Sequence, residues 1–258
     1  RLSLVGSEMC IRDRSTNDDI IIIDAEREYG DLVRALRGIV LEISPNSRHH
    51  INPLEIARGY GMGENPVALK SELLMSICEQ QMGEGQLGAF HKSIIDRCTA
   101  LVYQEAQQKG TVATLCDLRD KILEQPEDKA KEIALSLELF TKGSLDIFGH
   151  ESTVDLDKRI VVFDIRSLGA QLKPTGLLVI TDTILNRVTL NWKKGKRTHV
   201  FIDEFHVVFE NEQSGIFFNS AWRQFRKRGA YPTAITQNVE YLLDSVQAST
   251  CLLYTSDA

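Results

Sequence analysis

Arg197-Thr198-His199-Val200-Phe201-Ile202-Asp203-Glu204-Phe205 is the stretch of sequence that decides the fold. It becomes apolar towards Ile202 and then ends in two adjacent carboxylates, Asp203 and Glu204. A short continuous apolar run is typical of a parallel strand that is covered on both faces. In open α/β sheets, ligands bind just beyond the carboxyl ends of the strands. The stretch therefore predicts a buried parallel strand with two candidate site residues at its end.

An Asp-Glu pair in this position has two tasks in P-loop ATPases. The first acid orders Mg²⁺, usually through water, because this ion keeps most of its hydration shell. The second acid positions and polarises the water that attacks the phosphate. The alternative interpretation is a strand that enters a loop through Asp-Glu and has no catalytic role.

Other β-type runs precede and follow this strand, at 19–24, 39–43, 159–165 and 232–236. Helical segments alternate with them, at 32–36, 174–192 and about 214–228. We expect Asp31 to cap the first of these helices, Gly38 to end it, and Pro174 to begin the second. This alternation predicts an α/β fold with a mainly parallel, doubly wound sheet.

The composition changes near Pro66, and helical periods without strand signals continue to about Gly149. The first of these helices places Leu69, Leu73 and Ile77 on one face. Thr114 is a suitable cap for a later helix. We therefore expect a small all-α subdomain inserted into the α/β core.

Both ends of the chain read as translated sequencing adapter. Residues 4–13 match one frame of a transposase-type adapter, and residues 251–258 match a frame of its reverse complement. Such segments are set aside before the fold is considered. The expected organisation is adapter-derived residues 1–14, a first core part 15–65, an all-α insertion 66–150, a second core part 151–250 and adapter-derived residues 251–258. The natural part is then a fragment of a longer protein.

Composition limits the classes of function. The net charge of −6 does not favour non-specific wrapping of nucleic acid, although a local basic patch is compatible with it. Between the expected adapter ends, the cysteines Cys78, Cys98 and Cys116 form no C-x-x-C pair. Their odd number supports neither a disulfide framework nor a zinc site, and it fits a reducing cytoplasm. No apolar run approaches the roughly 20 residues of a membrane span.

Parallel order places the carboxyl ends of neighbouring strands on one edge of the sheet. We therefore expect Gln237, which follows the last predicted strand, to lie beside Asp203 and Glu204. An amide in this place can contact a γ-phosphate or the attacking water. The alternative is a loop amide that caps a helix.

The helix before that strand ends in Trp222-Arg223-Gln224-Phe225-Arg226-Lys227-Arg228-Gly229, which carries four cations. Trp222 and Phe225 face inward together, so the cations project elsewhere. Three interpretations stay open. Arg226 or Arg228 could reach a neighbouring subunit's phosphate as arginine fingers, the cations could contact nucleic acid, or they could complement the helix dipole.

No G-x-x-x-x-G-K-[ST] sequence occurs in this chain. A P-loop ATPase needs this motif, because its backbone N–H groups and its Lys hold the phosphates. We expect the motif upstream of the strand that begins at Asp19. As it stands, this polypeptide is not expected to hydrolyse ATP.

Taken together, these segments resemble the TraC/TraE/CagE-like cytoplasmic ATPases of type IV secretion and conjugation systems. The resemblance covers nearly all of 19–249, and the order and spacing of its motifs make it specific. The motifs are Ile23-Asp24-Ala25-Glu26-Arg27-Glu28-Tyr29, Ser44-Pro45-Asn46-Ser47 with Ile51-Asn52-Pro53, Val162-Phe163-Asp164-Ile165, Val200-Phe201-Ile202-Asp203-Glu204-Phe205, and Arg226-Lys227-Arg228-Gly229 with Ile235-Thr236-Gln237-Asn238-Val239. The family usually has Pro where Ala25 stands, which is a mild departure.

The resemblance implies a RecA-like P-loop NTPase core with an inserted all-α subdomain, binding ATP and Mg²⁺. By position, Asp203 would order Mg²⁺ through water, Glu204 would be the catalytic base and Gln237 the γ-phosphate sensor. Arg226 and Arg228 would be the candidate trans-acting arginines. The resemblance also implies a homo-hexamer without membrane spans. It would lie in the cytoplasm at the inner face of the cell membrane, in contact with inner-membrane secretion-channel components and with DNA or a protein substrate.

Two other functions fit the same residues. One is a DNA-translocating ATPase, either a conjugative coupling protein or an FtsK/HerA-type translocase, which DNA-stimulated hydrolysis would reveal. The other is a non-catalytic scaffold subunit whose nucleotide site has decayed, which an upstream P-loop without its Lys would reveal.

Overall fold

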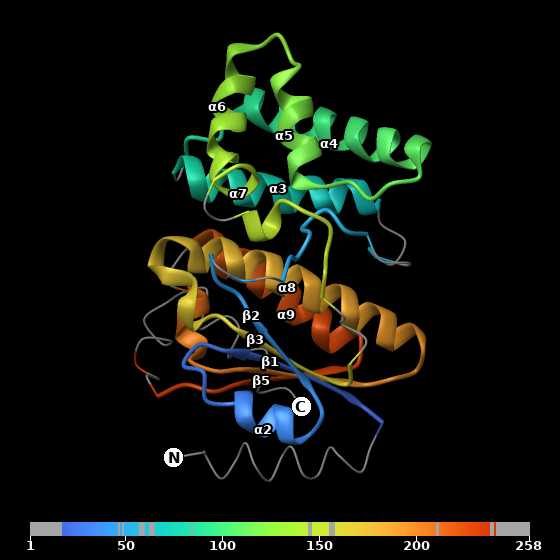
Figure 1. Cartoon of the computed structure of the whole chain (residues 1–258), viewed down its shortest axis with the longest axis vertical. Helices are drawn as coiled ribbons and strands as arrows, with labels where there is room; N and C mark the ends of the chain where they lie inside the picture. The colour runs from blue at the N-terminus through green and yellow to red at the C-terminus, as the bar shows by residue number, and fades with distance from the viewer. Residues whose placement is uncertain are drawn as a thin grey trace. The chain divides into compact units, whose positions relative to one another are not determined.

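The structure is a computed structural model of the 258-residue chain (Figure 1). It describes residues 17–45, 47, 49–56, 60–61, 65–83, 85–143, 146–154, 158–209, 212–237 and 240. The expected adapter-derived ends and the motif residues Asn46, Asn238 and Val239 lie outside these residues.

The chain divides into two compact units. The first comprises residues 1–43, 155–169 and 184–258, and the second comprises 44–154 and 170–183. The second unit thus begins at Ser44, earlier than the Pro66 expected for the insertion. It also takes in part of a long helix near residue 175.

The first unit is built on five strands: β1 (Asp19–Asp24), β2 (Ile39–Glu42), β3 (Ile160–Asp164), β4 (Thr198–Ile202) and β5 (Ala230–Ala234). Their order in the sheet is β2-β3-β1-β4-β5, and each neighbouring pair is parallel. The mainly parallel α/β sheet expected from the sequence is therefore confirmed. Because Ile23 is aligned with both Phe163 and Ile202, the carboxyl ends of the three central strands lie on one edge.

Helices α2 (Gly30–Ala35) and α9 (Glu212–Lys227) lie on opposite sides of this sheet (Figure 1). On the α2 side, Val33 and Tyr29 pack in a buried cluster with sheet residues that include Ile20 and Val162. On the α9 side, Phe205 packs against Phe209, Phe218 and Trp222, with ring centroids 5.1 to 5.7 Å away. Trp222 and Phe225 are both buried, as their helical spacing predicted.

Two helix starts differ from the expectation. α2 begins at Gly30 without a side-chain cap, and Asp31 lies within its first turn. The carboxylate of Asp24 accepts the N–H group of Tyr29 at 3.0 Å and so holds the chain just ahead of the helix. α8 (Gly169–Lys193) starts before Pro174, directly after a 3₁₀ turn at 166–168. A proline inside a helix removes one backbone hydrogen bond, and here the surrounding turns keep the helical path.

The second unit is helical: α3 (Pro66–Met82), α4 (Ala89–Lys109), α5 (Leu115–Leu123), α6 (Asp128–Ser136) and α7 (Glu138–Thr141), with residues 170–183 of α8. The expected run of helices is therefore confirmed. Thr114 caps α5 as expected, since its hydroxyl accepts the N–H group of Asp117 at 3.2 Å.

A buried ion pair joins α3 to the middle of α8 inside this unit. The ammonium group of Lys70 lies 2.6 Å from a carboxylate oxygen of Asp182, and both side chains are almost fully buried. Lys70 also donates to the carbonyl of Pro53 at 2.8 Å, and the Tyr60 hydroxyl donates to Asp182 at 2.5 Å. Because several hydrogen bonds satisfy both charges, the pair is compatible with burial.

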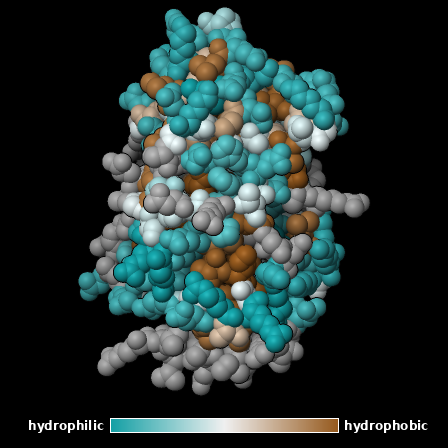
Figure 2. All heavy atoms as spheres, in the orientation of Figure 1, coloured by the Kyte–Doolittle hydropathy of each residue, from teal (hydrophilic) through white to brown (hydrophobic). Residues whose placement is uncertain are grey.

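Hydrophilic side chains predominate on the face of the molecule that Figure 2 shows. Within the described residues, no helix has both the length and the apolar character that crossing a bilayer requires.

Candidate functional site

Asp203 and Glu204 directly follow β4, at the carboxyl edge of the sheet. The N–H group of Asp203 donates to the carbonyl of Ile23 at 3.0 Å, and that of Phe205 donates to Ile235 at 2.8 Å. Hydrogen bonds on both sides therefore hold the chain where the two acids emerge. Glu204 has φ 47°, a left-handed conformation that is uncommon for residues other than glycine. Such conformations cluster at functional sites.

Gln237 lies beside Glu204, as expected from the order of the strands. Its amide nitrogen donates to a carboxylate oxygen of Glu204 at 2.7 Å. The ring of His206 approaches the other carboxylate oxygen of Glu204, with 3.3 Å between Nδ1 and Oε2. Sequence reasoning missed His206, because the 3₁₀ turn Phe205–Phe209 that brings it back to Glu204 has no clear spacing signal. Glu204 is thus held by a hydrogen bond from Gln237 and lies next to the ring of His206.

Asp203 is 9% exposed and surrounded by other acids. The pKa of its carboxyl is raised to about 6, chiefly by burial and in addition by the nearby charges of Asp24, Glu204 and Glu28, against a backbone hydrogen bond that lowers it. Neighbouring carboxylates disfavour the charged form of Asp203 because like charges repel, and a bound cation would remove this repulsion.

Asp24 ends the neighbouring strand β1, and its carboxylate is completely buried. It accepts N–H groups from Glu26, Glu28 and Tyr29 at 3.3, 3.1 and 3.0 Å. These hydrogen bonds fold residues 25–29 into a tight loop at the carboxyl edge. The strand-ending acid was visible in the sequence, but its use as an acceptor for the loop was not.

Arg27, in the same loop, joins the carboxyl ends of three strands. Its guanidinium contacts Asp164 of β3 at 2.5 Å, Glu42 of β2 at 3.0 Å and the Ser167 hydroxyl at 3.0 Å. Arg27 itself has φ 62°. With its left-handed backbone conformation and these partners, Arg27 fixes the loop beside Asp203. The motif around Arg27 was recognised in the sequence, but this bridging role was not.

The donor set at this edge fits a divalent cation. Mg²⁺ prefers oxygen ligands, and it binds through one or two carboxylates, several waters and the phosphates of a substrate. Asp203, with Glu204 and Glu28 nearby, offers carboxylate oxygens and an excess of negative charge. Within the described residues, no cluster of three or more His, Cys, Asp and Glu side chains could hold a metal by itself.

Arg226 and Arg228 lie elsewhere in the first unit. They precede β5, at the amino-terminal edge of the sheet, so they do not meet Asp203 within the same chain. Arg226 is exposed, whereas Arg228 donates to the hydroxyl of Thr189 at 2.6 Å. This arrangement is compatible with a trans-acting Arg226, and it gives Arg228 a contact within the subunit. Their assignment as arginine fingers stays a prediction.

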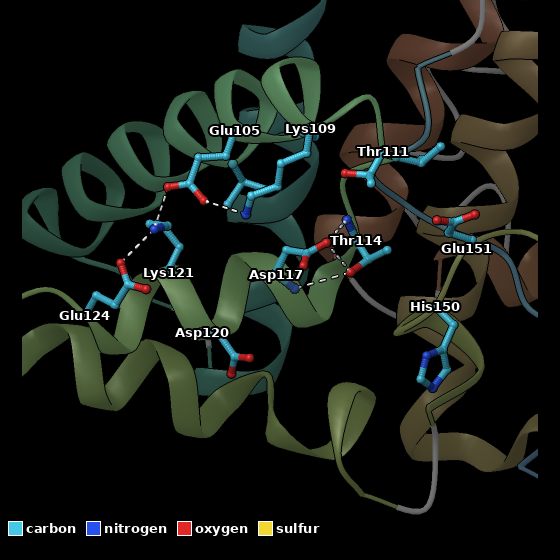
Figure 3. Close-up of a pocket in the computed structure, with 13 residues that line it drawn as sticks. Glu105, Lys109, Thr111, Thr114, Asp117, Asp120, Lys121, Glu124, His150 and Glu151 are labelled. Carbon is cyan, nitrogen blue, oxygen red and sulfur yellow. Dashed lines mark hydrogen bonds and ion pairs between the residues drawn. The ribbon is translucent and has the colours of Figure 1, made fainter.

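A pocket of about 560 Å³ lies in the helical unit, between α4, α5 and the segment around His150 (Figure 3). Several of its polar and charged side chains contact one another. Lys121 contacts Glu105 at 2.6 Å and Glu124 at 2.7 Å, and Asp117 accepts the N–H group of Thr114 at 2.9 Å. None of the residues expected to be catalytic lines this pocket.

No protein-family model and no curated protein matches the chain. Among solved structures, VirB4 of Thermoanaerobacter pseudethanolicus superimposes with a TM-score of 0.80 over 99% of this chain and 71% of VirB4, at 20% sequence identity. The chain has the VirB4 fold.

The bacterial conjugative coupling protein TrwBΔN70, in an unbound monoclinic form, has a TM-score of 0.56 at 16% identity. That match covers 97% of this chain and 63% of TrwB. The RecA-like P-loop NTPase fold that the motifs implied is therefore confirmed, and the VirB4 fold agrees with the resemblance seen in the sequence. At these identities the likeness establishes the fold, and the roles of Asp203, Glu204, Gln237, Arg226 and Arg228 stay predictions.

Proposed function

We propose that this chain is part of the ATP-hydrolysing motor subunit that powers type IV secretion or conjugative transfer and pilus assembly. The observation that carries the proposal is the Asp203-Glu204 pair at the end of β4, with Gln237 bonded to Glu204 at 2.7 Å. In a parallel sheet this edge is where ligands bind. The likeness to VirB4, at a TM-score of 0.80, supports the same function.

Each site residue then has a defined role. Mg²⁺, when bound with ATP, would neutralise charge on the phosphate oxygens. Asp203 would bind water molecules of the hydration shell of Mg²⁺. Glu204 would orient the attacking water and accept its proton, while Gln237 would keep the Glu204 carboxylate in place and contact the γ-phosphate.

The proposal includes an assembly. The chain spans 71% of VirB4, so the activity and partners of the whole protein go beyond the residues described here. We propose a homo-hexamer in which Arg226 of one subunit reaches the nucleotide of the next. Arg226 is exposed, and it lies at the opposite edge of the sheet from Asp203. The hexamer would lie in the cytoplasm against the inner face of the membrane, on inner-membrane secretion-channel components.

The direct test is Glu204→Gln in the full-length protein that contains this chain. Removing the base should lower ATP turnover by on the order of a hundredfold or more and leave ATP bound. Phosphate release and retained radiolabelled ATP would be measured together. Glu72→Gln, an exposed residue of α3, is the matched control and should have normal activity. Normal hydrolysis by Glu204→Gln would disprove the assignment.

A second candidate function is a DNA-translocating ATPase of the coupling-protein type, which the likeness to TrwB supports at a TM-score of 0.56. The same assay separates the two candidates. Strong stimulation of ATP turnover by double-stranded DNA would favour the translocase, and turnover that does not respond to DNA would favour the secretion motor.

A further inference from the structure

Four acids form one row across the carboxyl edge of the core sheet. Asp24, at the end of β1, is aligned with Asp164 at the end of β3, and Asp164 is aligned with Glu42 at the end of β2. On the other side of β1, the register of β4 places Asp203, which directly follows that strand, level with Asp24. Neighbouring strands are about 4.8 Å apart, so the four negative charges repel one another. The row therefore needs positive charge or hydrogen-bond donors.

The middle of the row is satisfied by backbone groups. Asp24 accepts three N–H groups from the loop at residues 25–29. Asp164 accepts the N–H group of Arg166 at 3.2 Å. Asp203, at one end of the row, has a carboxyl whose pKa is raised to about 6, chiefly by burial and further by neighbouring acids. The charge of Asp203 is therefore poorly compensated by the protein.

Arg27 supplies a positive charge at the other end of the row. Its Nε lies 2.5 Å from a carboxylate oxygen of Asp164, and its Nη2 lies 3.0 Å from Glu42. Nη2 also donates to the Ser167 hydroxyl at 3.0 Å. The hydrogen bond to Asp164 raises the pKa of the guanidinium above its usual value, so this group stays charged. One cation thus serves two neighbouring acids, of which Asp164 has a side chain that is only 4% exposed.

We propose that Arg27 is a positioning residue that decides where a divalent ion binds at this edge. Its guanidinium occupies the end of the row formed by Glu42 and Asp164, and it leaves the Asp203 end for a single ion. A guanidinium holds two carboxylates in a fixed geometry and cannot dissociate from the chain. Mg²⁺, in contrast, binds through one or two carboxylates together with waters and phosphates.

The consequence for the proposed reaction is that Mg²⁺ is confined to the end of β4, next to Glu204. Without Arg27, the carboxylates of Glu42, Asp164 and Asp24 would offer a second ion an alternative place on the same edge. The inference rests on the proposed function only for the identity of the ion at Asp203. The role of Arg27 itself follows from its contacts and from the register of the strands.

The test counts the Mn²⁺ ions that the purified chain binds without nucleotide, from the electron paramagnetic resonance signal of the free ion. Mn²⁺ shares the preference of Mg²⁺ for carboxylate oxygens. Arg27→Gln leaves Asp164 and Glu42 without their cation, so this variant should bind one more Mn²⁺ per chain than the original. Arg27→Lys keeps the charge and should bind the same number as the original. Equal numbers for Arg27→Gln and the original chain would overturn the proposal, as would an extra ion in Arg27→Lys.

Two further variants locate the extra ion. Arg27→Gln combined with Asp164→Asn should return to the number of the original chain, because the central partner of Arg27 has lost its charge. Arg34→Gln is the matched control, since Arg34 forms an exposed pair with Asp31 at 3.0 Å on α2. It should bind the same number of ions as the original. An extra ion that persists without the Asp164 carboxylate would contradict the proposal.

Thermal unfolding separates this role from a purely structural one. Arg27→Gln should melt at a lower temperature than the original chain. Mn²⁺ at about a hundred times the dissociation constant of the extra site should raise that temperature by about 5 to 10 °C, because the ion binds only the folded state. If Arg27→Gln is unfolded without metal, circular dichroism should show refolding in Mn²⁺. A variant whose folding does not respond to Mn²⁺ would overturn the proposal.

These measurements are independent of ATP hydrolysis. Normal hydrolysis by Glu204→Gln would disprove the catalytic assignment and leave the Mn²⁺ counts unchanged. Equal counts in Arg27→Gln and the original chain would disprove the role of Arg27 and leave the assignment of Glu204 intact.

Discussion

Gln237 donates a hydrogen bond of 2.7 Å to the carboxylate of Glu204, although the two residues are 33 positions apart in the sequence. The bond forms because β4 and β5 are parallel neighbours, so the segments after both strands leave the sheet at the same edge. Glu204 contacts His206 on its other oxygen. A base that a hydrogen bond holds has a defined direction, which proton transfer from an attacking water requires.

Gln237→Ala should therefore slow ATP hydrolysis by the full-length protein much more than it weakens ATP binding. A misplaced catalytic group costs on the order of a hundredfold in rate. We expect turnover to fall by about that factor, and the dissociation constant for ATP, measured by a fluorescent ATP analogue, to rise much less. Gln224→Ala, at a half-buried side chain of α9, serves as the control. An unchanged rate for Gln237→Ala would leave Gln237 as a loop amide.

Arg226→Ala should lower ATP turnover only in the assembled oligomer, because a trans-acting arginine acts on a neighbouring subunit's nucleotide. Turnover would be followed across protein concentrations that change the oligomer, with size measured by light scattering. Equal loss of activity in the monomer would indicate a structural role instead.

Arg228→Ala is expected to have a second effect, because Arg228 bonds to Thr189 within the subunit. The free energy of unfolding should fall by about 1.5 to 3 kcal/mol, the range for a hydrogen bond to a charged group. Chemical denaturation would measure it, and Arg226→Ala is the matched control with its exposed side chain. If both variants unfold alike, the bond to Thr189 contributes no stability.

Lys70→Met should strongly destabilise the helical unit. The change leaves the buried carboxylate of Asp182 without its cation, and such a loss costs about 3 to 5 kcal/mol. Lys70→Met with Asp182→Leu should regain much of that stability, since no buried charge is left unpaired. Urea denaturation followed by circular dichroism tests both variants. A double variant no more stable than Lys70→Met would show that the hydrogen bonds to Tyr60 and Pro53, rather than the charge pair, hold α3 to α8.

Cys78 should react slowly with iodoacetamide. Burial raises the pKa of its thiol to about 12, so the reactive thiolate is about a thousandfold scarcer than in an exposed cysteine below pH 9. Cys116 is only half-buried, and we expect it to be alkylated first of the two. Peptide mapping by mass spectrometry at pH 8 would give both rates, and in urea the rates should become equal. Faster labelling of Cys78 in the folded chain would contradict its burial.

The sequence by itself determined the strands, the parallel sheet and the run of helices. Apolar β-branched runs such as 19–24 have few alternatives to a buried strand, and the strand-helix alternation leaves little choice of sheet type. The placement of Gln237 beside Glu204 also followed from sequence, because parallel order alone brings strand ends together. Helix starts were less predictable: α8 begins at Gly169 because the turn before it already sets a helical path that Pro174 joins.

Only the tertiary structure decided which side chains surround these strand ends. Arg27 bridges Asp164 and Glu42, and His206 turns back to Glu204, because left-handed and 3₁₀ turns direct their side chains. The order β2-β3-β1-β4-β5 likewise places Arg159 and Arg197, which directly precede β3 and β4, on either side of β1. Spacing along the chain specifies local periodicity, whereas the partner of a charge in space is set by how distant segments pack.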